Sequence, residues 1–230
     1  MKKLVLPALL LAILSGCSSS PASNDNKLTT IAGGQSVGDV VSFYWYTEQL
    51  SFPYSAADHV NSGVHGWYQS DYRWRDNVLR EVIRQGEQGV KDQGLLPYKV
   101  HLRFNKKGEA VYQQYRLDGK VLPMQAEQIS LIQQGALSIK ETVKAQDEKG
   151  HRLIQGYWDG KKFKTCSGDT YKNIEFNQIL PTFVLNRLAN LDSYAAFLGS
   201  QTPTKLTVLD LYTLDDESVD CVTRPVIIEE

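Results

Sequence analysis

What the sequence lacks excludes several classes of protein. The formal net charge is only −1, so the chain has no overall basic field, and we expect no nucleic-acid partner. Beyond the N-terminus no apolar run approaches the roughly 18 residues that a transmembrane helix needs. Walker-type loops and the patterns GxSxG, HExxH and GxGxxG do not occur either. We therefore predict a protein that is not an enzyme and that uses no cofactor.

Metal ligands are also sparse. The four histidines, at positions 59, 65, 101 and 151, are scattered, and neither CxxC nor HxxxH spacing occurs, so no metal site is predicted. His59 and His65 share a polar loop that contains glycine. One interpretation is that they bind a metal or act as a catalytic base. The other, which we favour, is that both are simply exposed to solvent.

The N-terminus has the pattern of an export signal. Lys2 and Lys3 precede a mostly apolar stretch over residues 4–14, and the small residues Ser15 and Gly16 follow. The apolar stretch is too short to cross a bilayer of roughly 30 Å at about 1.5 Å per residue. A signal peptide is therefore predicted over residues 1–16.

The residues Leu14, Ser15, Gly16 and Cys17 resemble the lipobox of bacterial lipoproteins. The resemblance implies cleavage before Cys17 and attachment of acyl chains to it, with an ordinary secretory signal as the alternative. Each buried methylene contributes about 0.8 kcal/mol, so two or three acyl chains anchor a protein stably in a membrane. Serine rather than aspartate follows the cysteine, which in this class implies the outer membrane, with the protein facing the periplasm. Residues 17–36 are expected to form a lipidated, flexible tether.

Removal of Cys17 from the count leaves Cys166 and Cys221. In an oxidising compartment these two are predicted to form a disulfide. The alternative makes Cys166 a nucleophile beside a histidine such as His151, although no recognised thiol-enzyme pattern surrounds it.

Hydrophobic periodicity predicts an α+β fold for residues 37–230, with residues 37–149 and 150–230 as two potential lobes. Tyr98, Val100, Leu102 and Phe104 alternate with polar residues, as in a half-buried antiparallel strand. Apolar stripes predict amphipathic helices over residues 125–145 and 181–198. Strands are predicted over the remaining apolar segments, ending with 205–214 and 218–228. The whole is mainly an antiparallel β meander, and its C-terminal part is compatible with a small barrel-like lobe.

Two sets of side chains are candidate binding surfaces. Ten aromatic residues between positions 43 and 74 could stack on sugar rings, such as those of peptidoglycan, or form the core of a sheet, which we favour. The second set is basic and could share one wet sheet face: Arg73, Arg75, Arg80, Arg84, Arg103 and His101. Within it Arg73, Arg80 and Arg103 are the candidate anion-binding residues, because guanidinium groups fit phosphate and carboxylate. The alternative is a solvated face balanced by Asp71, Asp76 and Glu81.

The segments VHLRFNKKGEAVYQQYRLDGKVLP and LIQGYWDGKKFKTC resemble the YjaH-type lipoproteins of Gram-negative bacteria, a family of unknown function. The resemblance implies envelope localisation and brings no catalytic or binding residues. We expect a non-enzymatic binding or accessory protein of the cell envelope, held to the membrane through Cys17, with an envelope protein or peptidoglycan as partner. The alternative is a binding module for an anionic envelope polymer, either peptidoglycan or lipid headgroups. An envelope hydrolase is the least favoured interpretation.

Overall fold

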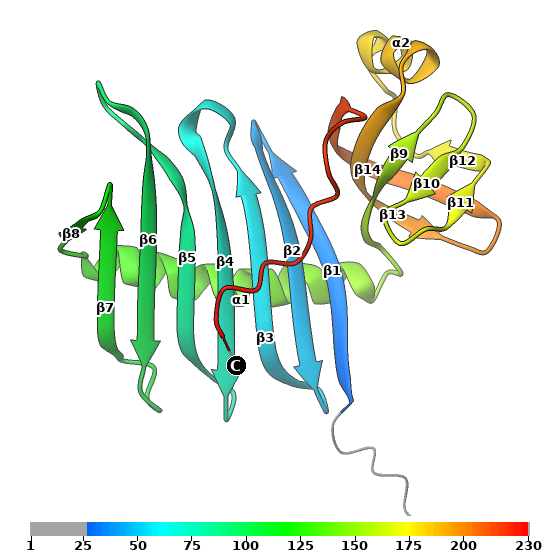
Figure 1. Ribbon diagram of the computed structural model, residues 1–230. Coiled ribbons are helices and arrows are strands. Elements are labelled where there is room, and N and C mark those ends of the chain that lie inside the picture. Colours follow the sequence, from blue (N-terminus) through cyan, green and yellow to red (C-terminus); the bar gives the residue numbers. More distant parts are fainter. Residues whose placement is uncertain (1–26, 230) are drawn as a thin grey trace, which may run out of the picture.

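The first sheet is an eight-stranded antiparallel meander. It appears in a computed structural model that describes residues 27–229 (Figure 1). Each strand pairs with the next one along the chain, and a single 3₁₀ turn, Gly63–His65, lies between β3 and β4. The strands are β1 (Leu28–Val37), β2 (Val40–Gln49), β3 (Phe52–Asn61), β4 (Gly66–Arg75), β5 (Val78–Val90), β6 (Gly94–Phe104), β7 (Ala110–Leu117) and β8 (Lys120–Leu122).

Alternating burial explains the meander. In β6, Val100, Leu102 and Phe104 are buried, whereas Arg103 points to the opposite, solvated face. Every second residue of a strand faces the same side, so one face of the sheet becomes apolar and needs a cover. The predicted antiparallel β meander is confirmed.

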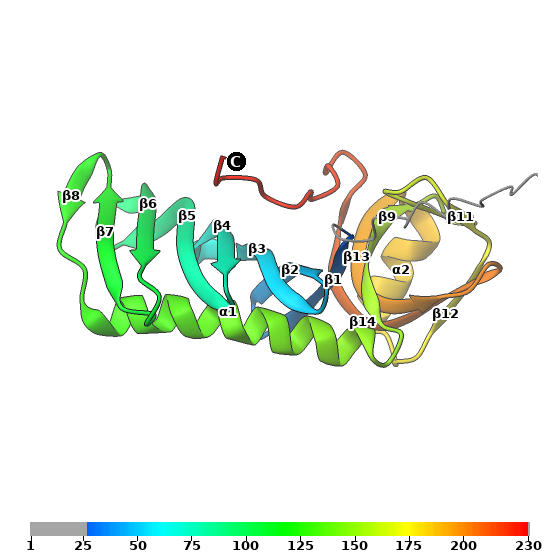
Figure 2. The ribbon, with the colours of Figure 1, turned by 90° about the horizontal axis from the view of Figure 1, so that it is seen from below.

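The cover is α1 (Ala126–Asp147), which crosses the apolar face of the first sheet (Figure 2). Ile132, Ala136, Ile139 and Val143 are buried at helical spacing, which confirms the predicted stripe. The end of the helix is fixed to β1, because the Gln146 side chain accepts a hydrogen bond from the Gly34 amide (3.1 Å) and donates one to its carbonyl (2.7 Å). A side chain on Gly33 would collide with Gln146, so the glycine makes this approach possible.

The second sheet has six strands and curls into a nearly closed barrel, which confirms the predicted barrel-like lobe. Its spatial order is β11-β10-β9-β13-β14-β12, and α2 (Thr182–Asn190) packs beside it. The strands are β9 (Arg152–Trp158), β10 (Phe163–Thr165), β11 (Thr170–Tyr171), β12 (Asn173–Phe176), β13 (Ser193–Gln201) and β14 (Lys205–Asp216). The parallel β12–β14 pair is the exception to the antiparallel pairing of the described strands.

The predicted second helix over residues 181–198 is wrong in its second half. The helix ends at Asn190, and Ser193–Gln201 forms β13, the strand between β9 and β14. Tyr194, Ala195, Ala196 and Phe197 are all buried, because this central strand is covered on both faces. A short run that is apolar throughout fits a helix and a buried strand equally well by periodicity, and here the sheet decides.

Two further predictions were wrong at the chain ends. Residues 218–228 form no strand. They belong to a tail, residues 217–229, that runs without strand pairing over the face of the first sheet opposite α1 (Figures 1 and 2). The predicted tether extends too far, because Leu28–Val37 is β1. The signal peptide and Cys17 lie outside the described residues. Within residues 27–229, no helix combines the length and the apolar character of a membrane span.

The two sheets share a core. Phe43, Trp45 and Ala57 of the first sheet pack with Tyr194 and Tyr212 of the second. The Tyr212 hydroxyl also donates a hydrogen bond of 2.7 Å to the Gly34 carbonyl. Burial of this joint cluster therefore holds the sheets together.

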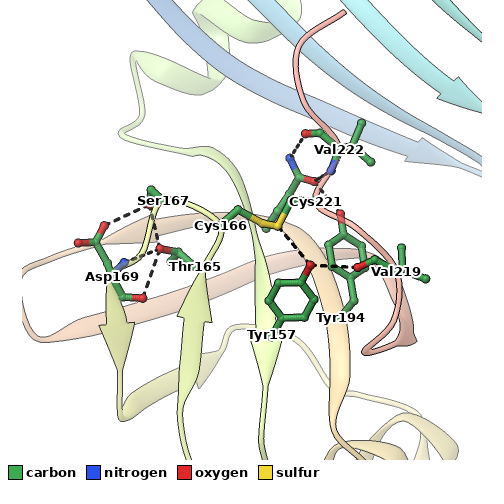
Figure 3. Close-up of a disulfide and its surroundings, with 10 residues drawn as sticks. Tyr157, Thr165, Cys166, Ser167, Asp169, Tyr194, Val219, Cys221 and Val222 are labelled. Carbon is green, nitrogen blue, oxygen red and sulfur yellow. Dashed lines mark hydrogen bonds between the residues drawn. A yellow bond between two sulfur atoms is a disulfide. The ribbon is translucent and has the colours of Figure 1, made fainter.

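The predicted disulfide between Cys166 and Cys221 is present and joins the end of β10 to the start of the tail (Figure 3). Around it, the Gln155 side chain donates to the Val222 carbonyl and accepts from the Val222 amide, each at 2.9 Å. The Tyr157 hydroxyl donates to the Val219 carbonyl (3.1 Å). The disulfide and these hydrogen bonds thus fix the position of the tail where it leaves the second sheet.

Candidate anion-binding cleft

A cleft of about 920 Å³ lies at one edge of the first sheet. We call this the lower edge: it holds the start of β1 and the β2–β3, β4–β5 and β6–β7 turns, at the bottom of Figure 1. The β2–β3 and β4–β5 turns and the end of the tail form its walls. Its lining residues are Gln49, Leu50, Phe52, Pro53, Tyr54, Arg73, Trp74, Arg75, Asp76, Asn77, Arg80, Glu81, Ile228 and Glu229.

Two β-bulges place side chains in the cleft. Between β2 and β3, Thr47 pairs with Ser55 and Glu48 with Pro53, so Tyr54 is the extra residue. Between β4 and β5, the pairing steps from Arg73–Glu81 to Trp74–Leu79, which leaves Arg80 as the extra residue. A bulge bends the strand and redirects the side chain of its extra residue. Both Tyr54 and Arg80 line the cleft for this reason.

Arg75 and Arg80 are the most available of the cleft arginines. Arg80 uses only Nε, which donates to the Phe104 carbonyl at 2.9 Å. Arg75 is exposed and makes no hydrogen bond or ion pair with any described residue. Neither side chain has a carboxylate partner between residues 27 and 229, so both can offer paired N–H donors to an anion.

Arg73 is partly committed to the protein itself. Its Nη2 lies 3.7 Å from Oδ2 of Asp71 and donates a 3.4 Å hydrogen bond to the Ile228 carbonyl. Asp71 is fully buried under the tail, where its Oδ2 accepts the amides of Ile227 and Ile228 at 3.1 Å each. Arg73 therefore supports the tail wall of the cleft and is only secondarily a ligand-binding group.

Arg103, the third predicted anion-binding residue, is bound to Glu81. Its Nε donates to Glu81 Oε1 at 2.9 Å, and His101 Nε2 lies 2.7 Å from the same oxygen. Burial would raise the pKa of Glu81, but the hydrogen bonds from His101 and Arg103 outweigh burial and lower it below its ordinary value. The structure thus brings Arg73 and Arg80 into the cleft, whereas Arg103 neutralises a cleft carboxylate from the neighbouring strand.

Arg84 is not on the wet face that the sequence suggested. It points to the α1 side, where Nε donates to Ser70 Oγ (2.8 Å) and Nη2 to the Tyr72 hydroxyl (3.0 Å). The Tyr72 hydroxyl donates in turn to Asp58 Oδ2 at 2.8 Å. Burial would lower the pKa of the Arg84 guanidinium, but the neighbouring Tyr72 and Asp58 outweigh it and raise that pKa. Arg84 is a structural residue because a buried charge needs these partners.

The β2–β3 turn is strained. Its two central residues, Leu50 and Ser51, have φ values of +50° and +68°, as a type I′ hairpin turn requires. Glycine, asparagine and aspartate tolerate this region, whereas leucine there costs roughly 1–2 kcal/mol. The neighbouring β4–β5 turn uses Asp76 and Asn77, which suit the same turn. Leu50 and Phe52 are 62% and 59% exposed at the rim of the cleft.

Most of the aromatic run belongs to the core, as we predicted. Phe43, Tyr44, Trp45, Tyr46, Tyr72 and Trp74 are buried. Phe52 and Trp67 are exposed, and Tyr54 is half-buried in the cleft. The cleft therefore combines arginines with part of this aromatic run, a combination that the strand alternation alone did not predict.

His59 and His65 do not form a joint site, and the prediction that both lie exposed in one polar loop is wrong for His59, which is half-buried in a strand. His59 lies on β3 and stacks on Trp67 at 6.2 Å between ring centroids, and Gln69 Nε2 lies 3.3 Å from its Nδ1. His65 is exposed in the 3₁₀ turn, as expected for that residue. Within residues 27–229, no group of three or more potential ligands is placed to hold a metal ion.

The architecture defines an α+β protein with an arginine- and aromatic-lined cleft at a sheet edge. The chain belongs to a family described as a protein of unknown function (DUF1481), whose model matches residues 32–226. The match extends from β1 into the tail and includes both cysteines of the disulfide and the three cleft arginines. No curated protein and no solved structure matches the chain.

Proposed function

We propose that this protein is a non-enzymatic binding protein of the cell envelope and that its cleft holds a phosphate or carboxylate group of an envelope component. One observation carries the proposal: the guanidinium groups of Arg75 and Arg80 line a cleft of about 920 Å³ without a carboxylate partner among the described residues. Arginine binds phosphate and carboxylate through two parallel hydrogen bonds.

The chemistry of the cleft suits binding better than catalysis. Arginine stays protonated at neutral pH and does not act as a general acid or base. Glu81 could do so, but the hydrogen bonds from His101 and Arg103 outweigh burial and lower its pKa, which makes it a weaker base. Phe52, Tyr54 and Trp74 add apolar surface beside the arginines. We therefore propose a ligand whose anionic group adjoins an apolar or ring-shaped portion.

The proposed location comes from the N-terminal sequence. The lipobox at Cys17, followed by Ser18, supports an outer-membrane lipoprotein that faces the periplasm. In that location the anionic groups at hand are membrane headgroups and the carboxylates of peptidoglycan.

The test is an NMR titration of the chain that begins at Ser18, which contains every described helix and strand. We expect inorganic phosphate to shift the amide signals of residues 50–52, 54, 75–77 and 80. Arg75→Gln removes a charged donor that has no side-chain partner among residues 27–229. It should weaken the affinity for phosphate about tenfold or more, from the roughly 1.5–3 kcal/mol of a hydrogen bond to a charged group.

Arg152→Gln is the matched control, because Arg152 is exposed on β9 and its side chain likewise makes no hydrogen bond or ion pair with a described residue. It should leave the titration unchanged. Shifts that are absent from the cleft, or that persist equally in Arg75→Gln, would overturn the proposal.

A further inference from the structure

We infer that the lower edge of the first sheet is a membrane-docking surface, and that the group bound in the cleft is the headgroup phosphate of anionic phospholipid in the membrane that holds Cys17. This inference rests on the proposed function and names the ligand of the same cleft.

The chain enters the fold at the lower edge of the first sheet. β1 begins at Leu28, which pairs directly with Gln49, and Gln49 lines the cleft. Ten residues, 18–27, separate Cys17 from Leu28, so the two can be at most about 40 Å apart. An anchor attached beside a surface gives that surface a high effective concentration at the membrane. The lower edge is therefore the part of the sheet that the anchor holds nearest to the lipid.

The lower edge carries exposed apolar side chains. Leu28, Leu50 and Phe52 are 47%, 62% and 59% exposed there. Arg75 and Arg80 line the same cleft as Leu50 and Phe52. Exposed apolar side chains beside basic ones are the combination that binds at a membrane interface, where the former enter the acyl boundary and the latter contact anionic headgroups.

Leu50 is an unusual residue for its position in the β2–β3 turn. Leu50 adopts φ +50° in a turn where asparagine would be relaxed, and its side chain is 62% exposed, so core packing does not account for a leucine at this position. Insertion of this side chain into lipid would explain an exposed leucine that core packing does not explain. The phosphate of a headgroup would then lie at the level of Arg75 and Arg80, with Phe52 and Tyr54 beside its glycerol portion.

The experiment is co-sedimentation of the chain that begins at Ser18 with vesicles of phosphatidylglycerol and phosphatidylethanolamine. Phosphatidylcholine vesicles serve as the uncharged comparison. We expect binding to the anionic vesicles that weakens with salt. Arg75→Gln should weaken it roughly fivefold, which corresponds to about 1 kcal/mol per basic residue near an anionic surface.

Leu50→Asn separates docking from folding. Because asparagine tolerates the left-handed turn, the melting temperature should hold or rise, while vesicle binding falls roughly tenfold with loss of the inserted side chain. The matched controls lie on the opposite edge: Val64→Asn removes an 87% exposed apolar residue, and Lys91→Gln an exposed cation. Both controls should bind vesicles as the parent chain does.

The outcomes distinguish this inference from the proposed function. Absence of vesicle binding, or equal losses in the four variants, would overturn membrane docking. If phosphate still shifts the cleft signals in that case, the anion-binding function stands and the membrane is not its source. Retention on purified peptidoglycan sacculi that depends on Arg75, without vesicle binding, would assign the ligand to the cell wall and likewise overturn the inference.

Discussion

At the residue scale, burial and pairing decide which arginines are available to a ligand. Arg84 is committed to Asp58 and Tyr72 beneath the sheet, and Arg103 to Glu81 on the wet face. Arg75 and Arg80 retain free donors. These side chains have identical chemistry, so their different roles come entirely from the groups around them.

Glu81 should make stability depend on pH. Its pKa in the folded protein is below the ordinary value of 4.5, so its ionised form stabilises the fold. That contribution is fully present above the unfolded-state pKa and is lost as pH falls through the lower folded-state pKa. The difference in unfolding free energy between the parent chain and Glu81→Gln should therefore shrink as pH falls below 4.5. Urea unfolding at a series of pH values measures this difference.

Glu141→Gln is the control for this measurement, because Glu141 is exposed on α1 and its side chain makes no hydrogen bond or ion pair with a described residue. Its difference from the parent chain should be small and flat with pH. A Glu81→Gln difference that is equally flat from acid to neutral pH would contradict the role assigned to the His101 and Arg103 hydrogen bonds.

At the scale of secondary-structure elements, bulges, turns and the tail shape the cleft. The bulged residues Tyr54 and Arg80 turn toward the cleft, and the tail closes one side with Ile228 and Glu229. The tail has no strand partner, so its position depends on side chains, above all on Asp71. The wall that the tail provides therefore depends on the buried Asp71 carboxylate together with Arg73, which donates to the Ile228 carbonyl.

Asp71→Ala should release the end of the tail. The change leaves the buried amides of Ile227 and Ile228 without their acceptor and removes the partner of Arg224 and Arg73. We expect these amides to lose their protection from hydrogen exchange. The unfolding free energy should fall by about 3 kcal/mol, from unsatisfied donors and a broken buried ion pair.

Asp39→Ala, in the exposed β1–β2 turn, is the comparison for Asp71→Ala and should change neither quantity. If the amides of Ile227 and Ile228 keep their protection in Asp71→Ala, the tail is held by other contacts.

The whole molecule is held together at two places. The shared core of Trp45, Tyr194 and Tyr212 joins the two sheets, and the disulfide fixes the start of the tail to β10. The tail then reaches back to the first sheet, so the second sheet, the disulfide and the cleft are linked in sequence. A change at the disulfide can thus affect a cleft on the other sheet.

Replacement of Cys166 and Cys221 by serine should lower the unfolding free energy by up to about 4 kcal/mol, because the disulfide closes a segment with a separation of 55 residues. Urea unfolding of the double variant measures the loss, and reduction of the parent chain should reproduce it. Dithiothreitol should have no effect on the double variant. Equal stability of the reduced and oxidised parent would show that the disulfide adds nothing to the fold.

Local pattern was sufficient for the meander, for α1 and for the disulfide pair. The alternation in β6 and the stripe on α1 are properties of neighbouring residues, so they could be predicted without knowledge of the rest of the chain. Cys166 and Cys221 could be paired because Cys17 was assigned to the anchor and only two candidates remained. Arg73 and Arg80 were found by their residue type.

The rest depended on partners distant in sequence. Residues 193–201 form a strand because β9 and β14 flank them, which no window of local sequence contains. Tyr54 and Arg80 enter the cleft through bulges, and a bulge is a mismatch in register between two strands. By itself the sequence determined the meander, the helix across it and the supply of arginines. Only the tertiary structure decided which arginines stay free, because burial and pairing are set by strands that meet in space.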